Sequence, residues 1–123
     1  MKRLSIILLF FVLVSACGHE DKGFMPDRLL TKQEMMAILA DVQIIEADLN
    51  RQKNQEREHK DSIPHKPVDY VKLSRTYYDQ LFEHYGINDS IFSQNMKYYA
   101  LHPDDLEIIL DSVEQRLLRE QQQ

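Results

Sequence analysis

The sequence of 123 residues has a single cysteine, no tryptophan, three glycines and four prolines. One cysteine excludes an internal disulfide, so the fold is not a disulfide-stabilised scaffold. Three scattered glycines cannot form the glycine-rich loop that holds phosphate groups in nucleotide-binding proteins. A formal net charge of −5 disfavours nucleic acid as a partner. Of the whole chain, 43% of the residues are hydrophobic and 28% are charged, which is typical of one small globular domain.

The first 16 residues differ in composition from the rest of the chain. Lys2 and Arg3 precede an almost unbroken apolar run over residues 4–14, and small residues follow it. A basic start, a short apolar stretch and small residues before a cleavage point are typical of a secretory signal peptide. The run is also shorter than the roughly 20 residues that span a bilayer. Residues 1–16 are therefore predicted to be a signal peptide, with a permanent transmembrane helix as the alternative.

The end of this segment, Val14-Ser15-Ala16-Cys17, resembles the lipobox of bacterial lipoproteins. The resemblance implies that Cys17 becomes the new N-terminus and that its sulfur carries a diacylglyceryl group, with fatty acids such as palmitate. Each buried CH₂ contributes about 0.8 kcal/mol, so two or three chains anchor the protein stably without spanning the membrane. Ordinary signal cleavage, which leaves a free or buried cysteine, is the alternative.

Residues 17–30 are predicted to be the lipidated cysteine and a flexible tether with a relaxed span of about 20 Å. The tether begins with Gly18-His19-Glu20-Asp21-Lys22. Acidic residues just behind a lipidated cysteine resemble the surface-export signals of Bacteroidota lipoproteins, although the order of the charges differs here. A plain polar tether is the alternative.

Two long helices are predicted from apolar residues at helical spacing. Thr31-Lys32-Gln33-Glu34 is a capping box and begins the first helix. Its apolar stripe comprises Met35, Ile38, Leu39, Val42, Ile45 and Leu49. The second begins at Pro67 or Val68 and ends at Gly86, a residue type that favours a helix C-terminus. Its apolar face comprises Tyr70, Leu73, Tyr77, Leu81 and Tyr85, with Tyr78 and Phe82 beside it.

Two further helices follow. Asn88 or Asp89 caps a short one, and Pro103 begins the last. The short helix has an apolar face of Ile91, Phe92, Met96 and Tyr99. The last has a stripe of Leu106, Ile109, Leu110, Val113, Leu117 and Leu118.

The fold class predicted from these patterns is all-α, a small antiparallel bundle of three to four helices over residues 31–120. No alternating strand pattern of useful length is present. Residues 51–67 are predicted to be a charged linker within this domain. Its first part, residues 51–62, has no hydrophobic side chain and is either a solvated extension of the first helix or disordered.

Catalytic chemistry finds little support in the sequence. The five histidines are scattered without the spacing of metal ligands, and no nucleophile motif or cofactor-binding motif is present. We therefore expect no enzyme, no metal and no cofactor. Asp41 and Glu46 are the speculative polar site, with a solvated helix face as the plainer explanation. A hydrolase would require both of them to meet a histidine in one cleft.

The tyrosines are the more informative residues. Six tyrosines are present in the chain, all between residues 70 and 99. Packing in the core is one explanation for them. A surface for a partner or ligand is the other, because aromatic rings with polar tips are enriched at protein interfaces. The residues assigned to this speculative surface are Tyr77, Tyr78, Phe82 and Tyr99.

The sequence resembles the Bacteroidota lipoproteins grouped as domain of unknown function 4296. The resemblance rests on residues 36–47 and 78–87, on Phe92 and Tyr98-Tyr99, and on the last leucine-rich helix. The resemblance covers residues 26–118. It implies a single helical domain in the cell envelope and carries no activity and no catalytic residues.

The function expected from these features is that of a non-enzymatic outer-membrane lipoprotein, facing either the periplasm or the cell surface. It is anchored through Cys17 and acts as an accessory or assembly partner of another envelope protein. The alternative is a carrier or sensor that binds a small apolar ligand between the tyrosine-rich helices. The sequence identifies neither the partner nor the oligomeric state.

Overall fold

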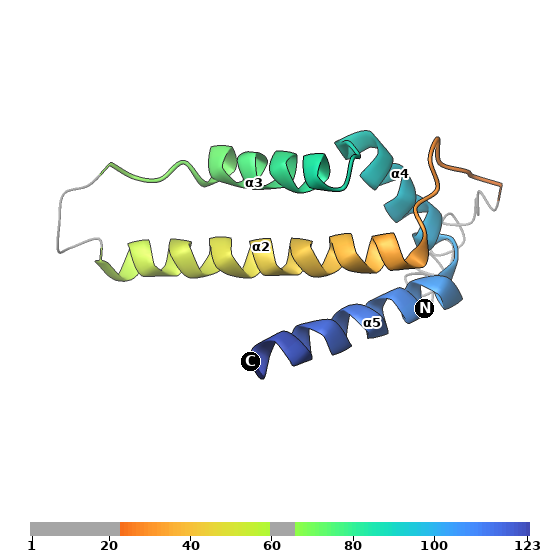
Figure 1. Cartoon of the computed structure of the whole chain (residues 1–123). Coiled ribbons are helices and arrows are strands. Elements are labelled where there is room, and N and C mark those ends of the chain that lie inside the picture. Colours follow the sequence, from red (N-terminus) through yellow and green to blue (C-terminus); the bar gives the residue numbers. More distant parts are fainter. Residues whose placement is uncertain (1–22, 60–65) are drawn as a thin grey trace, which may run out of the picture.

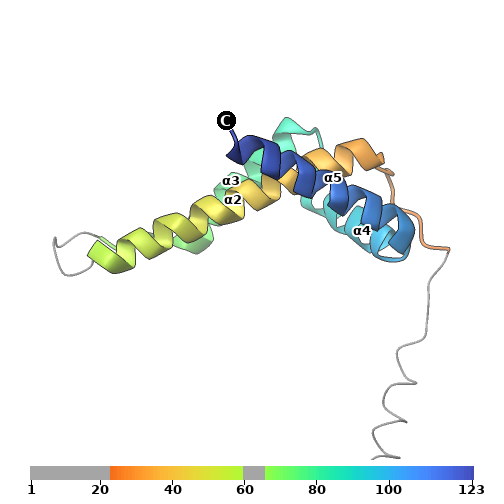
Figure 2. The ribbon, with the colours of Figure 1, turned by 90° about the horizontal axis from the view of Figure 1, so that it is seen from below.

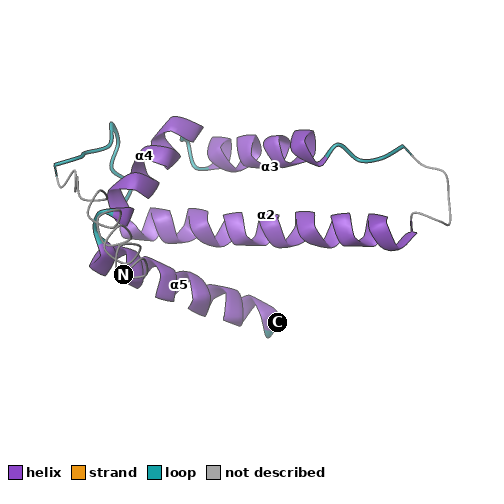
Figure 3. Cartoon of the chain, turned by 180° about the vertical axis from the view of Figure 1, so that it is seen from behind, coloured by secondary structure: helices purple, strands orange, loops and turns teal. Residues whose placement is uncertain are grey.

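The computed structural model of the chain describes residues 23–59 and 66–123. The predicted signal peptide, Cys17 and the start of the tether lie outside the described residues. Within them, the regular structure consists of helices alone, as the all-α prediction requires (Figures 1 and 3). The helices are α2 (Lys32–His59), α3 (Tyr70–His84), α4 (Asp89–Ala100) and α5 (Pro103–Gln121). None of them is long and apolar enough to cross a membrane, a finding that covers these residues only.

The long helix α2 lies between α3 and α5 (Figures 1 and 2). The helix α3 runs antiparallel to α2, whereas α5 crosses α2 and runs in the same general direction. The short helix α4 lies near the N-terminal end of α2 and connects α3 with α5. Antiparallel packing thus describes α2 with α3, but not α2 with α5.

The predicted capping box forms at the start of α2. The backbone amide of Glu34 donates to Thr31 Oγ1 at 3.1 Å, and Glu34 Oε2 accepts from the backbone amide of Thr31 at 2.7 Å. This backbone hydrogen bond is the main reason why the pKa of Glu34 is lowered. The stripe that follows points to the core, since Met35, Ile38, Leu39 and Leu49 are buried.

Residues 51–59 form the last turns of α2, so the predicted linker begins later than the sequence pattern indicated. Charged and amide side chains satisfy one another along the helix here. Arg51 pairs with Asp48, and Gln52 donates to the same carboxylate at 2.7 Å. Such pairs at spacings of three and four residues support a helix without apolar residues. The solvated helical extension is therefore the correct alternative for residues 51–59.

The helix α3 begins at Tyr70, slightly later than predicted, because Asp69 is its N-cap. The Asp69 side chain accepts a hydrogen bond from the backbone amide of Lys72 at 3.1 Å. The end of α3 is as predicted: Gly86 follows it with a φ of 63°. The amide of Ile87 then donates to the carbonyl of Phe82 at 2.9 Å, which closes the helix end.

The core lies where α2, α4 and α5 meet beside the end of α3. It contains Leu30, Met35, Ile38, Leu39, Ala40, Leu81, Phe82, Tyr99, Ile109 and Val113. Three residues predicted to face it do not, since Met96, Leu110 and Leu118 are 37%, 50% and 49% exposed. Helical spacing places these residues on the apolar face of their helix, but the neighbouring helices cover only part of that face. On α4, the buried position beside Met96 belongs to Asn95.

Candidate functional site

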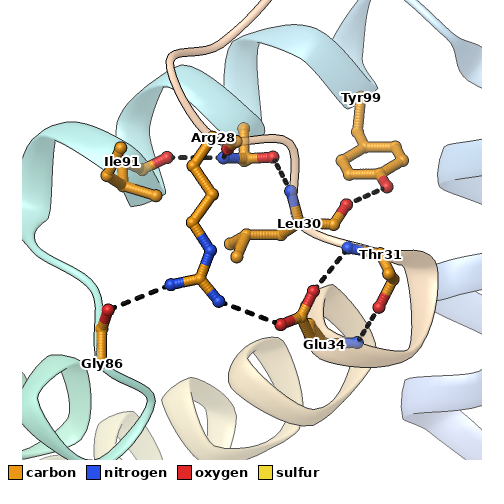
Figure 4. Close-up of polar contacts among 8 residues, drawn as sticks. Arg28, Leu30, Thr31, Glu34, Gly86, Ile91 and Tyr99 are labelled. Atoms are coloured by element: carbon orange, nitrogen blue, oxygen red, sulfur yellow. Dashed lines mark hydrogen bonds and ion pairs between the residues drawn. The ribbon is translucent and has the colours of Figure 1, made fainter.

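The chain before α2 is bound to α4, which corrects the prediction of a flexible tether up to residue 30. We call residues 26–30 the strap. The side chain of Asn95 is fully buried and forms hydrogen bonds with backbone groups of two strap residues, Arg28 and Leu30. Its Oδ1 accepts from the backbone amide of Leu30 at 2.8 Å, and its Nδ2 donates to the carbonyl of Arg28 at 2.7 Å. The same Nδ2 donates to the carbonyl of Ile91 at 2.8 Å, so both hydrogens of the amide and its oxygen have partners (Figure 4).

Two more side chains of α4 bind the strap. The hydroxyl of Tyr99 donates to the carbonyl of Leu30 at 2.6 Å, and burial raises the pKa of this tyrosine. Gln94 and Asp27 exchange two hydrogen bonds, since the Asp27 amide donates to Gln94 Oε1 at 2.7 Å and Gln94 Nε2 donates to the Asp27 carboxylate at 2.8 Å. Because buried backbone groups need partners, these bonds allow the Leu30 side chain to reach the core, where it is 1% exposed.

Arg28 joins the strap to two other elements. Its guanidinium donates to the carbonyl of Gly86 at 3.1 Å and to Glu34 at 3.2 Å (Figure 4). The strap therefore contacts α2, α4 and the turn that follows α3. It belongs to the folded domain.

The two carboxylates of the speculative polar site lie along the seam between α2 and α3, but each binds a different group. Asp41 accepts from the hydroxyl of Tyr85 at 2.5 Å and from Arg116 of α5 at 3.0 Å. Glu46 accepts from the hydroxyl of Tyr78 at 2.6 Å. Burial, and then the neighbouring carboxylate, raises the pKa of Tyr78 and of Tyr85 to about 12. These groups therefore hold helices together, and no histidine joins them in a shared cleft among the described residues.

The side chains predicted to form an aromatic surface lie in three places. Tyr78 and Phe82 line a groove between α3 and α4 of about 600 Å³. Tyr77 lines a separate groove of about 320 Å³ between α2 and α3. Tyr99 is in the core, 4% exposed, and binds the strap. The structure therefore brings together two of the four residues.

We call the first of these the α3–α4 groove. Three aromatic rings form its floor: the ring centroids of Tyr78 and Phe82 are 5.9 Å apart, and those of Phe82 and Phe92 are 5.2 Å apart. These spacings are typical of favourable aromatic pairs. The residues that line the groove are Val71, Ser74, Arg75, Tyr78, Asp79, Phe82, Asp89, Phe92 and Ser93.

A metal centre is not indicated by the described part of the chain, where no three histidine, cysteine or acidic side chains lie close enough to hold an ion. His84 is exposed, and the ring of His102 contacts the carbonyl of Tyr98 at 2.7 Å through Nδ1. Neither histidine approaches Asp41 or Glu46 by any hydrogen bond.

Sequence reasoning missed Asn95, Tyr85 and Arg116 as polar partners. A signal for Asn95 was present, since it lies four residues after Ile91 and four before Tyr99, within the apolar face of the helix. A polar residue in that position indicates a buried group with a specific partner. Nothing in the sequence identified Arg116 as the partner of Asp41, since α5 meets α2 only through the tertiary fold.

Comparison with known proteins identifies the family of the chain. The chain matches the family model described as domain of unknown function (DUF4296) over residues 26–123. It belongs to this family. The family match begins with the first residue of the strap, so the strap lies within the family's domain. No curated protein and no solved structure matches the sequence significantly.

Proposed function

We propose that the chain is a non-enzymatic lipoprotein of the Bacteroidota cell envelope, held at the outer membrane by acyl chains on Cys17, whose helical domain binds another envelope protein. The observation that supports this proposal is the integration of the strap into the domain. The chain that leads from Cys17 is held by buried hydrogen bonds of Asn95 from Arg28 onward. An anchor at Cys17 thereby limits how far the helices can move from the membrane.

The reach of such an anchor is short. Residues 18–25 separate Cys17 from the strap, and at about 3.5 Å per residue they extend no further than about 30 Å. The helical domain then remains close to the membrane that holds the lipid. A partner in the same membrane meets it at a high local concentration.

The polar groups of the domain favour an interaction role over catalysis. Asp41 binds Tyr85 and Arg116, and Glu46 binds Tyr78, so both carboxylates take part in contacts between helices. General acid or base catalysis needs a carboxylate within reach of a substrate proton.

The anchor is tested by metabolic labelling with an alkyne analogue of palmitate, in cells that produce either the natural chain or Cys17→Ser. We expect label on the natural chain and none on the variant, because the sulfur that takes the diacylglyceryl group is lost. Ser5→Ala, in the apolar part of the predicted signal peptide, is the control and keeps its label. Equal labelling of Cys17→Ser would contradict the proposal.

The interaction role is tested by crosslinking intact cells and purifying the protein from detergent-solubilised envelope. We expect one reproducible protein partner at native expression. Recovery of the lipoprotein alone, at the level of an unrelated envelope lipoprotein as control, would count against the interaction role and leave the anchor standing.

A second candidate function is that of a carrier for a small apolar ligand. The aromatic floor of the α3–α4 groove favours it, since the partly buried rings of Tyr78 and Phe92, in contact with the buried ring of Phe82, border a space of about 600 Å³. Native mass spectrometry of the protein purified in mild detergent would then show a bound adduct. A protein without adduct that takes up no lipid from vesicles would exclude the carrier.

A further inference from the structure

The α3–α4 groove continues as an apolar surface beyond its aromatic floor. Val71, at one end, is 74% exposed, the highest value among the large hydrophobic residues described. Met96, which is 37% exposed, lies one turn after Phe92 on the same side of α4. Exposed apolar residues around a groove mark interaction sites more often than scattered ones do.

The charged residues of this groove have no partner within the described part of the chain. Their side chains, those of Arg75, Asp79 and Asp89, are exposed and form no hydrogen bond or ion pair with another described residue. This contrasts with Asp41, Glu46 and Asp48, which are all bonded. The two aspartates exceed the single arginine, so the groove presents a net negative charge next to its apolar floor.

The groove follows one side of α3, from the exposed Val71 to Phe82 at the edge of the core. Val71, Arg75, Tyr78 and Phe82 recur at spacings of three and four residues and form one stripe. At 1.5 Å per residue this stripe is about 16 Å long, close to the length of three helical turns. A stripe of this length and an aromatic floor suit an amphipathic helix with apolar residues at the same spacing.

We propose that the α3–α4 groove binds an amphipathic helix of another envelope protein, with its apolar face on Val71, Tyr78 and Phe92 and a lysine or arginine directed to Asp79 and Asp89. The inference rests on the proposed function in one respect, since it places the partner in the same compartment. Charge complementarity decides the occupant. A neutral apolar ligand leaves the aspartates without partners, and an anionic lipid headgroup meets like charge.

The test places a photo-reactive amino acid at position 71 of the full chain in its native envelope. Ile108 on α5, which is 54% exposed, is the matched control position outside the groove. We expect a protein adduct from position 71 at several times the yield from position 108. Mass spectrometry of the crosslinked peptide is expected to show apolar residues at helical spacing next to lysine or arginine.

Charge reversal then tests the recognition itself. Asp79→Lys with Asp89→Lys is expected to lower the adduct yield roughly tenfold, since two attractive contacts become repulsive. Asp111→Lys, at an exposed acid of α5, is the control and leaves the yield unchanged. Far-ultraviolet circular dichroism of each purified variant tests whether it is folded. Exchange of the partner's basic residue for glutamate is expected to restore the yield with the reversed variant.

Several outcomes would overturn the inference. These are equal yields from positions 71 and 108, an adduct with lipid or a small molecule alone, an adduct with a second copy of this chain, and a yield that charge reversal does not change. The intact mass of the same sample reports separately on Cys17. An unmodified thiol there refutes the lipid anchor, whereas the crosslink still decides the groove.

Discussion

At the scale of single residues, three side chains of α4 bind the main chain of the strap much as a neighbouring strand would. Gln94, Asn95 and Tyr99 together pair backbone groups of Asp27, Arg28 and Leu30. The strap has no regular structure of its own to satisfy these groups. Because an unpaired buried backbone group costs free energy, the strap depends on these side chains for its place in the core.

The first prediction concerns Asn95. Replacing it with leucine leaves the amide of Leu30 and the carbonyl of Arg28 without partners, each at a cost of about 1 to 3 kcal/mol. We expect the free energy of unfolding, measured in urea, to fall by about 3 kcal/mol. Ser93→Ala, two residues away and exposed, is the control and should change it by less than about 0.5 kcal/mol. A loss no larger than the control's would show that the strap is held in another way.

The second prediction concerns alkaline pH. Tyrosines of the unfolded chain lose their protons near pH 10, whereas Tyr78 and Tyr85 keep theirs until about pH 12. Between these values the folded state binds more protons, so the free energy of unfolding falls as the pH rises. The contribution of the two hydroxyls is complete below pH 10 and lost as the pH passes about 12.

Urea unfolding of the natural chain and of Tyr78→Phe with Tyr85→Phe, at about pH 9 and at about pH 11.5, measures this effect. The double variant is less stable at the lower pH, and we expect the difference from the natural chain to shrink at the higher one. A constant difference would mean that the two hydroxyls do not titrate with raised pKa values.

The residue scale also shows where sequence reasoning reaches its limit. The sequence singled out Asp41 and Glu46 as paired carboxylates of a polar site, and both are bonded in the structure. Their partners lie far along the chain, Tyr78 on α3 and Tyr85 directly after it, and no local spacing relates them to the carboxylates. Asn95 was passed over in favour of Met96 because hydrophobicity alone ranks the thioether above the amide.

At the scale of helices and turns, local chemistry determines the ends of the elements. The capping box at Thr31, the cap at Asn88 and the start of α5 at Pro103 all lie where the sequence predicted them. Each depends on atoms only three residues apart or on the restricted φ of proline, so no distant contact is needed. Such features can be predicted from the sequence.

The third prediction tests the turn between α3 and α4. Gly86 has a φ of 63°, which is unfavourable for a residue with a Cβ atom, although no atom lies within 4 Å of an added Cβ. Gly86→Ala should therefore destabilise the protein by about 1 kcal/mol through the backbone alone. Gly23→Ala, which also meets open space and has no positive φ, is the control and should have almost no effect. Thermal unfolding of the two variants measures these effects. Equal melting temperatures would contradict the claim that the positive φ requires glycine at position 86.

The wrong predictions about helix faces and helix ends have a common cause. Leu110 and Leu118 follow the helical spacing of α5 yet are half exposed, and residues 51–59 lack apolar residues yet continue α2. Spacing along one helix does not state how much of its face a second helix covers. That depends on where α5 crosses α2 and on charge pairs such as Arg51 with Asp48.

At the scale of the whole molecule, the strap determines where the folded domain begins. The family match starts at Pro26. Leu30 is buried in the core, and the residues of α4 that bind it lie more than 60 residues later in the sequence. A contact of such long range could not be read from the sequence, which indicated a tether up to residue 30. The arrangement of α5 along the direction of α2 is likewise a property of the assembled core (Figure 2).

The fourth prediction compares two shortened chains. A chain that begins at Pro26 keeps the strap and should unfold at nearly the temperature of the full chain. A chain that begins at Thr31 loses the buried Leu30 side chain and the bonds to Asn95, which together contribute about 4 kcal/mol. We expect it to unfold at a much lower temperature, as followed by circular dichroism at 222 nm. Equal stability of the two chains would show that the strap is not part of the domain.

The intact mass of the mature protein purified from membranes decides whether Cys17 joins this domain to the bilayer. We expect a chain that begins at Cys17 and carries a diacylglyceryl group, with a further acyl chain on its amine. An unmodified thiol, or a chain that retains residues 1–16, would show that Cys17 is not a lipid anchor.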